Sequence, residues 1–178
     1  LVMHYDFDEM SGTVVQDKSG LFNDGTFQGE PEWTEGRFGG GVSFDGIDDF
    51  IDCGNPQNLG LSNQITISAW IKQRDAGNDE HNPWITKGDH SFALKHYSGN
   101  AYEFFVHDNG WNVVRAPVQA AHNKSWHHFA GTFDGSTLVM YIDGERVAEE
   151  TYSGIINQTD HPINIARNAE AADRFWNG

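Results

Sequence analysis

The sequence has little cysteine, proline or positive charge. Cys53 is its one cysteine among 178 residues, so no intrachain disulfide forms, and core packing or a bound metal must hold the fold. Its 11 Lys and Arg residues stand against 26 Asp and Glu, and the net charge of −15 argues against nucleic acid as a partner. No apolar run approaches the ~18 residues of a membrane-spanning helix, so we expect no membrane insertion.

Helical periodicity is also nearly absent. Only residues 168–174 look helical, and this stretch is too short to define a fold. What the chain does contain is 38% hydrophobic and 13% aromatic residues, enough for a packed core, together with 20 glycines that separate short runs. The longest run, residues 64–72, alternates Ile65, Ile67, Ala69 and Ile71 with polar residues and Trp70. Such alternation is typical of a strand in a sheet with two different faces.

Strand-like runs and tight turns follow one another along the rest of the chain. Residues 91–97, 102–107 and 111–116 form successive hairpins, and Asn109-Gly110 is a strong hairpin-turn signal. Further runs cover residues 2–7, 25–27, 41–44, 50–53, 84–86, 126–133, 138–142, 146–150 and 162–166. About a dozen short strands without helices between them predict an all-β fold, a two-sheet antiparallel β-sandwich or jelly roll.

Several ordered segments carry a family resemblance. They are YDFDEMSG (5–12), DKSG (17–20), NDGT (23–26), GRFGGGVSFDGIDDF (36–50), ISAWIK (67–72), WHHFA (126–130), TFDG (132–135) and YIDG (141–144). In this order and spacing they resemble the laminin-G-like and concanavalin A-like jelly-roll modules of bacterial surface and polysaccharide-degrading proteins. The resemblance implies one jelly-roll domain over residues 1–178. Family members usually continue beyond the FWNG position (175–178) with an acidic strand, so we expect a module excised from a larger protein and lacking its last strand.

The resemblance also implies a structural calcium ion near the N-terminal loops. Calcium takes about 6–8 oxygen ligands, which carboxylates, amide side chains and backbone carbonyls supply. The candidate ligands are Asp17, Asn23, Asp45 and Asp48. The same residue types also stabilise turns by accepting hydrogen bonds from backbone N–H groups, and the sequence leaves both interpretations open.

Aromatic and polar side chains suggest a carbohydrate site. Rigid aromatic rings stack on sugars at low entropic cost, and polar groups bind the hydroxyls. If Phe92, Leu94, Phe104 and Val106 face the core, alternation exposes Lys95, Tyr97, Phe105 and His107 on the other face. The candidate ligand-binding residues are Trp111, Tyr97, His107, Arg115, Lys95, Trp84 and His81, the last two bordering the polar stretch 75–82. Trp70 and Trp126 are expected in the core.

Catalytic signatures are missing from the sequence. Jelly-roll glycoside hydrolases of the laminarinase and agarase types carry Glu-x-Asp-x-x-Glu or a close variant on one strand, and no glutamate of this chain begins that pattern. The adjacent His127 and His128 would point to opposite faces of a strand, so they cannot chelate one metal together. The sequence therefore leans away from an enzyme.

The leading hypothesis is a non-catalytic carbohydrate-binding or adhesion module, calcium-stabilised and secreted or displayed on a cell surface. Its partners would be a polysaccharide or glycan and other domains of the parent protein. Two alternatives stay open. One is a polysaccharide hydrolase or lyase that uses Tyr97, His107 and Arg115, and the other is a protein-interaction spacer domain.

Overall fold

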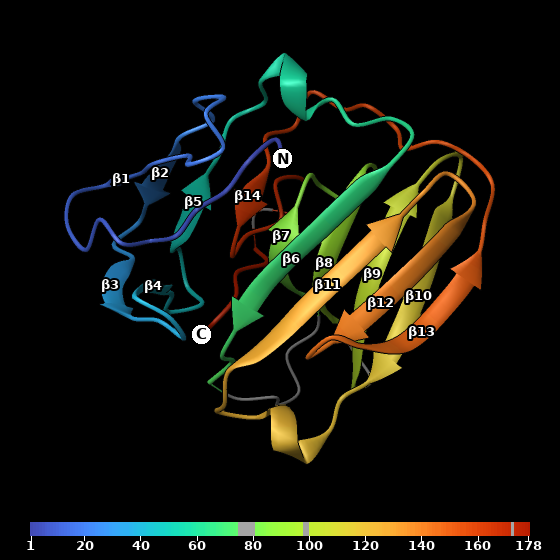
Figure 1. Cartoon of the computed structure of the whole chain (residues 1–178). Helices are drawn as coiled ribbons and strands as arrows, with labels where there is room; N and C mark the ends of the chain where they lie inside the picture. Colours follow the sequence, from blue (N-terminus) through green and yellow to red (C-terminus); the bar gives the residue numbers. More distant parts are fainter. Residues whose placement is uncertain (75–80, 98–99, 172) are drawn as a thin grey trace.

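The structure, a computed structural model, describes residues 1–74, 81–97, 100–171 and 173–178. Two antiparallel sheets pack face to face (Figure 1). The large sheet has eight strands in the order β1-β2-β5-β14-β7-β8-β9-β10, and the small sheet has four in the order β13-β12-β11-β6. The expected all-β sandwich is confirmed. Within the described ranges, no helix is long and apolar enough to cross a membrane.

The strands are short, as the turn-rich sequence predicts. The large sheet contains β1 (Val14–Val15), β2 (Gly25–Gln28), β5 (Phe50–Asp52), β14 (Asn164–Ile165), β7 (Asn82–Thr86), β8 (Phe92–Tyr97), β9 (Ala101–His107) and β10 (Trp111–Pro117). The small sheet contains β13 (Glu145–Thr151), β12 (Thr137–Ile142), β11 (His127–Phe133) and β6 (Ile65–Ile71). The hairpin β3 (Glu32–Glu35) and β4 (Gly40–Ser43) stands apart, and two 3-10 turns are η1 (Gln57–Leu59) and η2 (Ala120–His122).

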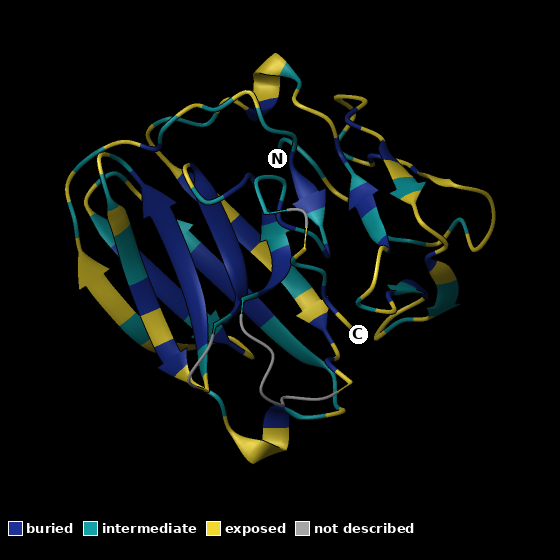
Figure 2. Ribbon diagram, turned by 180° about the vertical axis from the view of Figure 1, so that it is seen from behind, coloured by how far each residue is buried: buried dark blue, intermediate teal, exposed yellow. Residues whose placement is uncertain are grey.

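The core lies between the two sheets. Phe104 of β9 packs so closely on Gly131 of β11 that a Cβ on this glycine would overlap the phenyl ring. Trp84 of β7 joins the same contact region, with its ring 4.5 Å from that of Phe129 between centroids. In Figure 2 the buried residues run through the middle strands, and the exposed ones lie on edge strands and loops.

Several local expectations are wrong. Residues 2–7 form no strand, because the backbone there bonds to the loop at Asp17 and Lys18 instead of to a neighbouring strand. The described part of 168–174 is a loop rather than a helix. Trp70 is 39% exposed and Trp126 is only partly buried, so neither is a core residue. Trp84, expected near a ligand, is fully buried because its indole packs between the sheets.

Candidate functional site

One side of β8, β9 and β10 faces away from the small sheet; we call it the outer face. Since Phe104 points into the core, the alternation of the strand turns Phe105 to the outer face. Cross-strand pairing then puts Lys95 beside Glu103, Glu103 beside Arg115, and His107 beside Trp111. Of the seven predicted ligand-binding residues, the structure brings Lys95, Tyr97, His107, Trp111 and Arg115 to this face, and the ring of His81 packs on Tyr97 at 5.0 Å.

A buried carboxylate organises the middle of the outer face. Glu103 is 2% exposed, and its Oε1 lies 3.2 Å from the Lys95 ammonium while Oε2 accepts a 2.7 Å hydrogen bond from Arg115 Nε. The Arg115 guanidinium also lies 4.2 Å from the centre of the Tyr97 ring. Sequence reasoning missed Glu103, although its register between two cations was a usable signal. The ion pairs hold Arg115 in one position at the surface.

Trp111 stands at the other end of this face. Its indole is 60% exposed, and Nε1 donates a 3.0 Å hydrogen bond to the backbone oxygen of Asp89. The ring meets His107 edge to face at 5.2 Å and lies 6.0 Å from His90. Burial, followed by the charge of His90, lowers the pKa of His107. The indole is thus both open to solvent and fixed in orientation.

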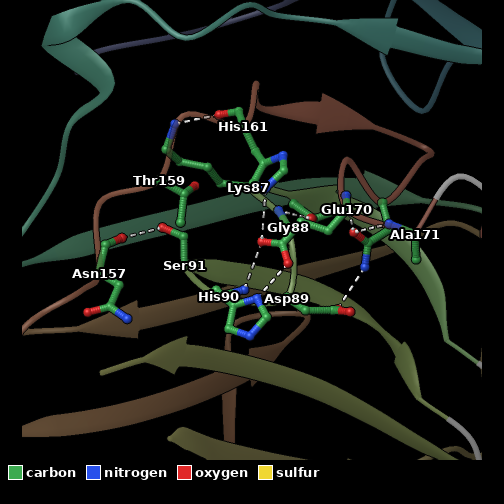
Figure 3. Close-up of polar contacts among 12 residues, drawn as sticks. Lys87, Gly88, Asp89, His90, Ser91, Asn157, Thr159, His161, Glu170 and Ala171 are labelled. Atoms are coloured by element: carbon green, nitrogen blue, oxygen red, sulfur yellow. Dashed lines mark hydrogen bonds and ion pairs between the residues drawn. The ribbon is translucent and has the colours of Figure 1, made fainter. Parts of the chain in front are cut away.

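The loop at residues 87–91 supports Trp111 through the backbone oxygen of Asp89. Figure 3 shows how this loop is tied to the C-terminal segment. Glu170 accepts hydrogen bonds from the backbone N–H of His90 at 3.1 Å, and its Oε2 lies 2.5 Å from His90 Nδ1. This hydrogen bond raises the pKa of His90. The Asp89 carboxylate accepts hydrogen bonds from the Arg174 guanidinium at 3.0 Å and from the Asn168 side-chain amide at 2.8 Å. None of these supporting contacts was predicted, because they join residues about eighty positions apart.

The outer face is more closed than the alternation pattern suggests. Phe105 was expected to be exposed, but it is completely buried because the Lys95 side chain crosses it, with the ammonium 5.0 Å from the ring. Lys95 and His107 are also buried. Among the described side chains of this site, Trp111, His90 and Arg115 are therefore exposed, and Tyr97 and His81 are partly open.

The four predicted calcium ligands do not converge on one point. Asn23 lies just before the start of β2 and donates its backbone N–H to Asp17, whereas Asp48 and its neighbour Asp49 contact Gly29, just after the end of β2. The two pairs thus lie at opposite ends of a strand. A single site made of Asp17, Asn23, Asp45 and Asp48 is wrong for this physical reason.

Asp17 anchors the N-terminal segment. Its carboxylate accepts hydrogen bonds from the backbone N–H groups of His4, Ser19 and Asn23 at 2.9 to 3.0 Å, and from the Ser19 hydroxyl at 2.7 Å. Burial acts to raise the pKa of Asp17, but these hydrogen bonds outweigh it and lower the pKa to about 2. This residue fits the turn-stabilising interpretation.

An Asp17→Asn variant should be less stable by about 2 kcal/mol at neutral pH, since it loses charge-assisted hydrogen bonds. The folded pKa of about 2 lies below the ordinary aspartate pKa of 3.8, so the carboxylate stabilises the fold fully above pH 3.8. The difference between wild type and variant should shrink as the pH falls from about 4 towards 2. Urea denaturation at several pH values measures it, and a difference that stays constant over this range contradicts the assignment.

The acidic turn between β4 and β5 remains as a candidate cation site. Asp45, Asp48 and Asp49 each offer a carboxylate oxygen, and these atoms lie within 4.8 Å of one another. They line a hollow of about 640 Å³ together with Glu30, Glu32 and Arg74, among others. Asp49 is buried and accepts the backbone N–H groups of Glu30 and Asp45 at 2.7 and 3.1 Å. An all-oxygen donor set of this kind suits a hard cation.

The two packed sheets and the acidic turn are typical of a jelly-roll module. The family model of the concanavalin A-like lectin/glucanases superfamily (Laminin_G_3) matches residues 45–178, and the chain therefore belongs to this superfamily. No curated protein matches the chain.

Solved structures share the fold. Domain 4 of AbnA, a GH43 extracellular arabinanase from Geobacillus stearothermophilus, in complex with arabinotriose, is 20% identical with a TM-score of 0.76, over 100% of this chain and 87% of that one. The binding domain of Paraclostridial Mosquitocidal Protein 1 is 14% identical with a TM-score of 0.76, over 93% and 44%. The botulinum neurotoxin serotype D binding domain is 13% identical with a TM-score of 0.63, over 97% and 49%. The chain thus spans nearly all of the arabinanase domain but less than half of the two toxin domains.

Proposed function

We propose that the chain is a non-catalytic carbohydrate-binding module whose ligand lies across the outer face beside Trp111. The observation that carries this proposal is the open indole with a fixed orientation. Its Nε1 is bonded to Asp89, so one edge of the ring is held by the protein while much of its surface is exposed. A rigid aromatic surface of this kind stacks on a sugar ring with little loss of entropy.

Polar groups with fixed positions complete the site. His90 is held by Glu170 and Arg115 by Glu103, and both side chains keep about half of their surface in solvent. Their remaining donors are free to bind sugar hydroxyls. Because these positions are set before a ligand arrives, little ordering cost accompanies binding. The complex of the similar arabinanase domain with arabinotriose supports a sugar ligand, and an extracellular setting within a larger protein.

The carboxylates on this face favour binding over hydrolysis. A glycosidase needs one carboxyl as acid and a second as base or nucleophile. Both carboxylate oxygens of Glu103 form ion pairs, one with Lys95 and one with Arg115. The carboxylate of Asp89 forms an ion pair with Arg174. His107, which a lyase mechanism would need, is buried and bonded to Asn157 at 3.0 Å.

Equilibrium titration against a panel of neutral oligosaccharides, including arabinotriose, tests the proposal. We expect saturable binding of at least one member and no release of reducing ends or unsaturated products during long incubation. Product release would support the hydrolase or lyase alternative. If no oligosaccharide of the panel binds and no product is released, the proposal is overturned and the spacer alternative remains.

A calcium ion at Asp45, Asp48 and Asp49 is the second part of the proposal. Millimolar calcium should raise the melting temperature by about 4 °C, because an ion that binds only the folded chain stabilises it. Asp48→Asn should remove the increase because it takes away one of the three carboxylates, and the exposed position of Asp48 should let the variant fold. Glu145→Gln, an equal charge change on exposed β13, should keep it. An increase of the same size in Asp48→Asn would contradict this site.

A further inference from the structure

Trp70, expected in the core, lies in an exposed group of side chains on the small sheet. In β6 the buried residues are Ile65, Ile67 and Ile71, so Trp70 points away from the core, as its alternate position requires. The edge strand β6 lies near the β3–β4 hairpin in Figure 1, and Phe38 from that hairpin meets the indole edge to face at 5.5 Å. Phe38 is 67% exposed. We call Arg37, Phe38, Trp70 and His128 the Trp70 platform.

A guanidinium and an imidazole accompany the two rings. The Arg37 guanidinium lies 4.9 Å from the centre of Phe38 and 5.4 Å from that of Trp70, while the His128 ring lies 5.4 Å from Trp70 on the neighbouring strand. Among the described residues Arg37 has no carboxylate partner, although acidic residues outnumber basic ones by 26 to 11. Of the ten other Lys and Arg residues, five form ion pairs with carboxylates: Lys18, Lys95, Arg115, Arg146 and Arg174.

The size of the platform limits its occupant. With Phe38 at 67% and Trp70 at 39% exposure, the two rings offer roughly 200 Å². A stable protein–protein interface needs about 800 Å² from each partner. The platform is therefore matched to a ligand of one or two rings rather than to a folded protein or a second copy of the chain.

We infer that the Trp70 platform binds an acidic sugar, a pyranose ring that carries a carboxylate. The ring stacks on the aromatic surface, and the carboxylate pairs with Arg37, whose planar guanidinium suits two parallel hydrogen bonds. A second pair of a cation and an aromatic ring lies along this edge, since the Lys72 ammonium is 5.9 Å from the centre of the Trp126 ring. Because Trp70 and Trp111 face outward from opposite sheets, the module would hold two glycan segments at once.

The test uses oligomers of galacturonate, glucuronate and mannuronate, with a neutral galactose trisaccharide for comparison, in calcium-free buffer. All titrations are made in a Trp111→Ala background, so the result does not depend on the outer face. We expect at least one uronate to bind and the neutral sugar to bind at least about tenfold more weakly. Trp70→Ala should weaken uronate binding about tenfold or more, and Arg37→Gln about fivefold or more.

Matched controls separate this site from general charge and surface effects. Arg146→Gln removes an exposed arginine of the small sheet that already has Glu149 as partner, and Phe22→Ala removes an exposed ring outside the platform. Both should bind within about twofold of the parent. The inference is overturned if no uronate binds, if the neutral sugar binds equally well, or if Trp70→Ala and Arg37→Gln behave like these controls.

Discussion

Trp111→Ala should weaken oligosaccharide binding to the outer face by about 30-fold, which corresponds to about 2 kcal/mol. The indole is the largest exposed surface of the site, and its hydrogen bond to Asp89 holds it ready for stacking. Fold stability should change little, because most of the ring surface already faces solvent. Titration of the variant with the best oligosaccharide of the panel measures the loss.

Two further variants make this result specific. Trp111→Phe keeps a flat ring without the Nε1 donor, so it should retain part of the affinity. Phe22→Ala removes a ring that is exposed to a greater extent, on a loop outside the site, and should bind like wild type. An affinity of Trp111→Ala within about twofold of wild type would mean that the ligand does not stack here.

Glu103→Ala should destabilise the fold by about 3 kcal/mol, because it leaves the buried ammonium of Lys95 without a counter-charge. It also frees Arg115, so sugar binding by the folded fraction should weaken as well. Urea denaturation gives the free energy of unfolding. The exposed pair Arg146 and Glu149 provides the comparison, and Glu149→Ala should cost no more than about 0.5 kcal/mol.

A double variant, Lys95→Met with Glu103→Leu, tests the cause of this loss. Replacing both partners of a buried ion pair by apolar residues is often neutral, so most of the stability should return. If Glu103→Ala costs less than about 1 kcal/mol, the carboxylate does not organise the outer face as described.

Alternation along hairpins predicted the outer face well, because it is a local property of the strands. Lys95, Tyr97 and His107 lie on the expected side, and Asn109-Gly110 correctly indicated a turn beside an exposed Trp111. The same rule applied to residues 64–72 would have turned Trp70 outward with Thr66 and Ser68. The apolar character of the indole suggested a core position instead. In the structure Trp70 points outward, as its alternate position in the strand requires.

What failed depends on contacts between distant segments. The support of Trp111 follows from contacts of the loop 87–91 with residues of the C-terminal segment, about eighty positions away. The burial of Phe105 is a local exception, since the Lys95 side chain that covers it comes from the neighbouring strand of the same hairpin. The calcium prediction grouped acidic turns by composition. Whether two turns meet depends on which end of β2 each one occupies, and that is a feature of topology rather than of local sequence.

The most direct test of the proposed function is the ¹H–¹⁵N spectrum of the tryptophan indole groups during titration with oligosaccharides. The signal of Trp111, assigned through Trp111→Phe, should move in a saturable way with at least one neutral sugar, while that of the buried Trp84 stays in place. A sugar that binds the chain without moving the Trp111 signal would contradict the central claim that this indole is the carbohydrate-binding surface.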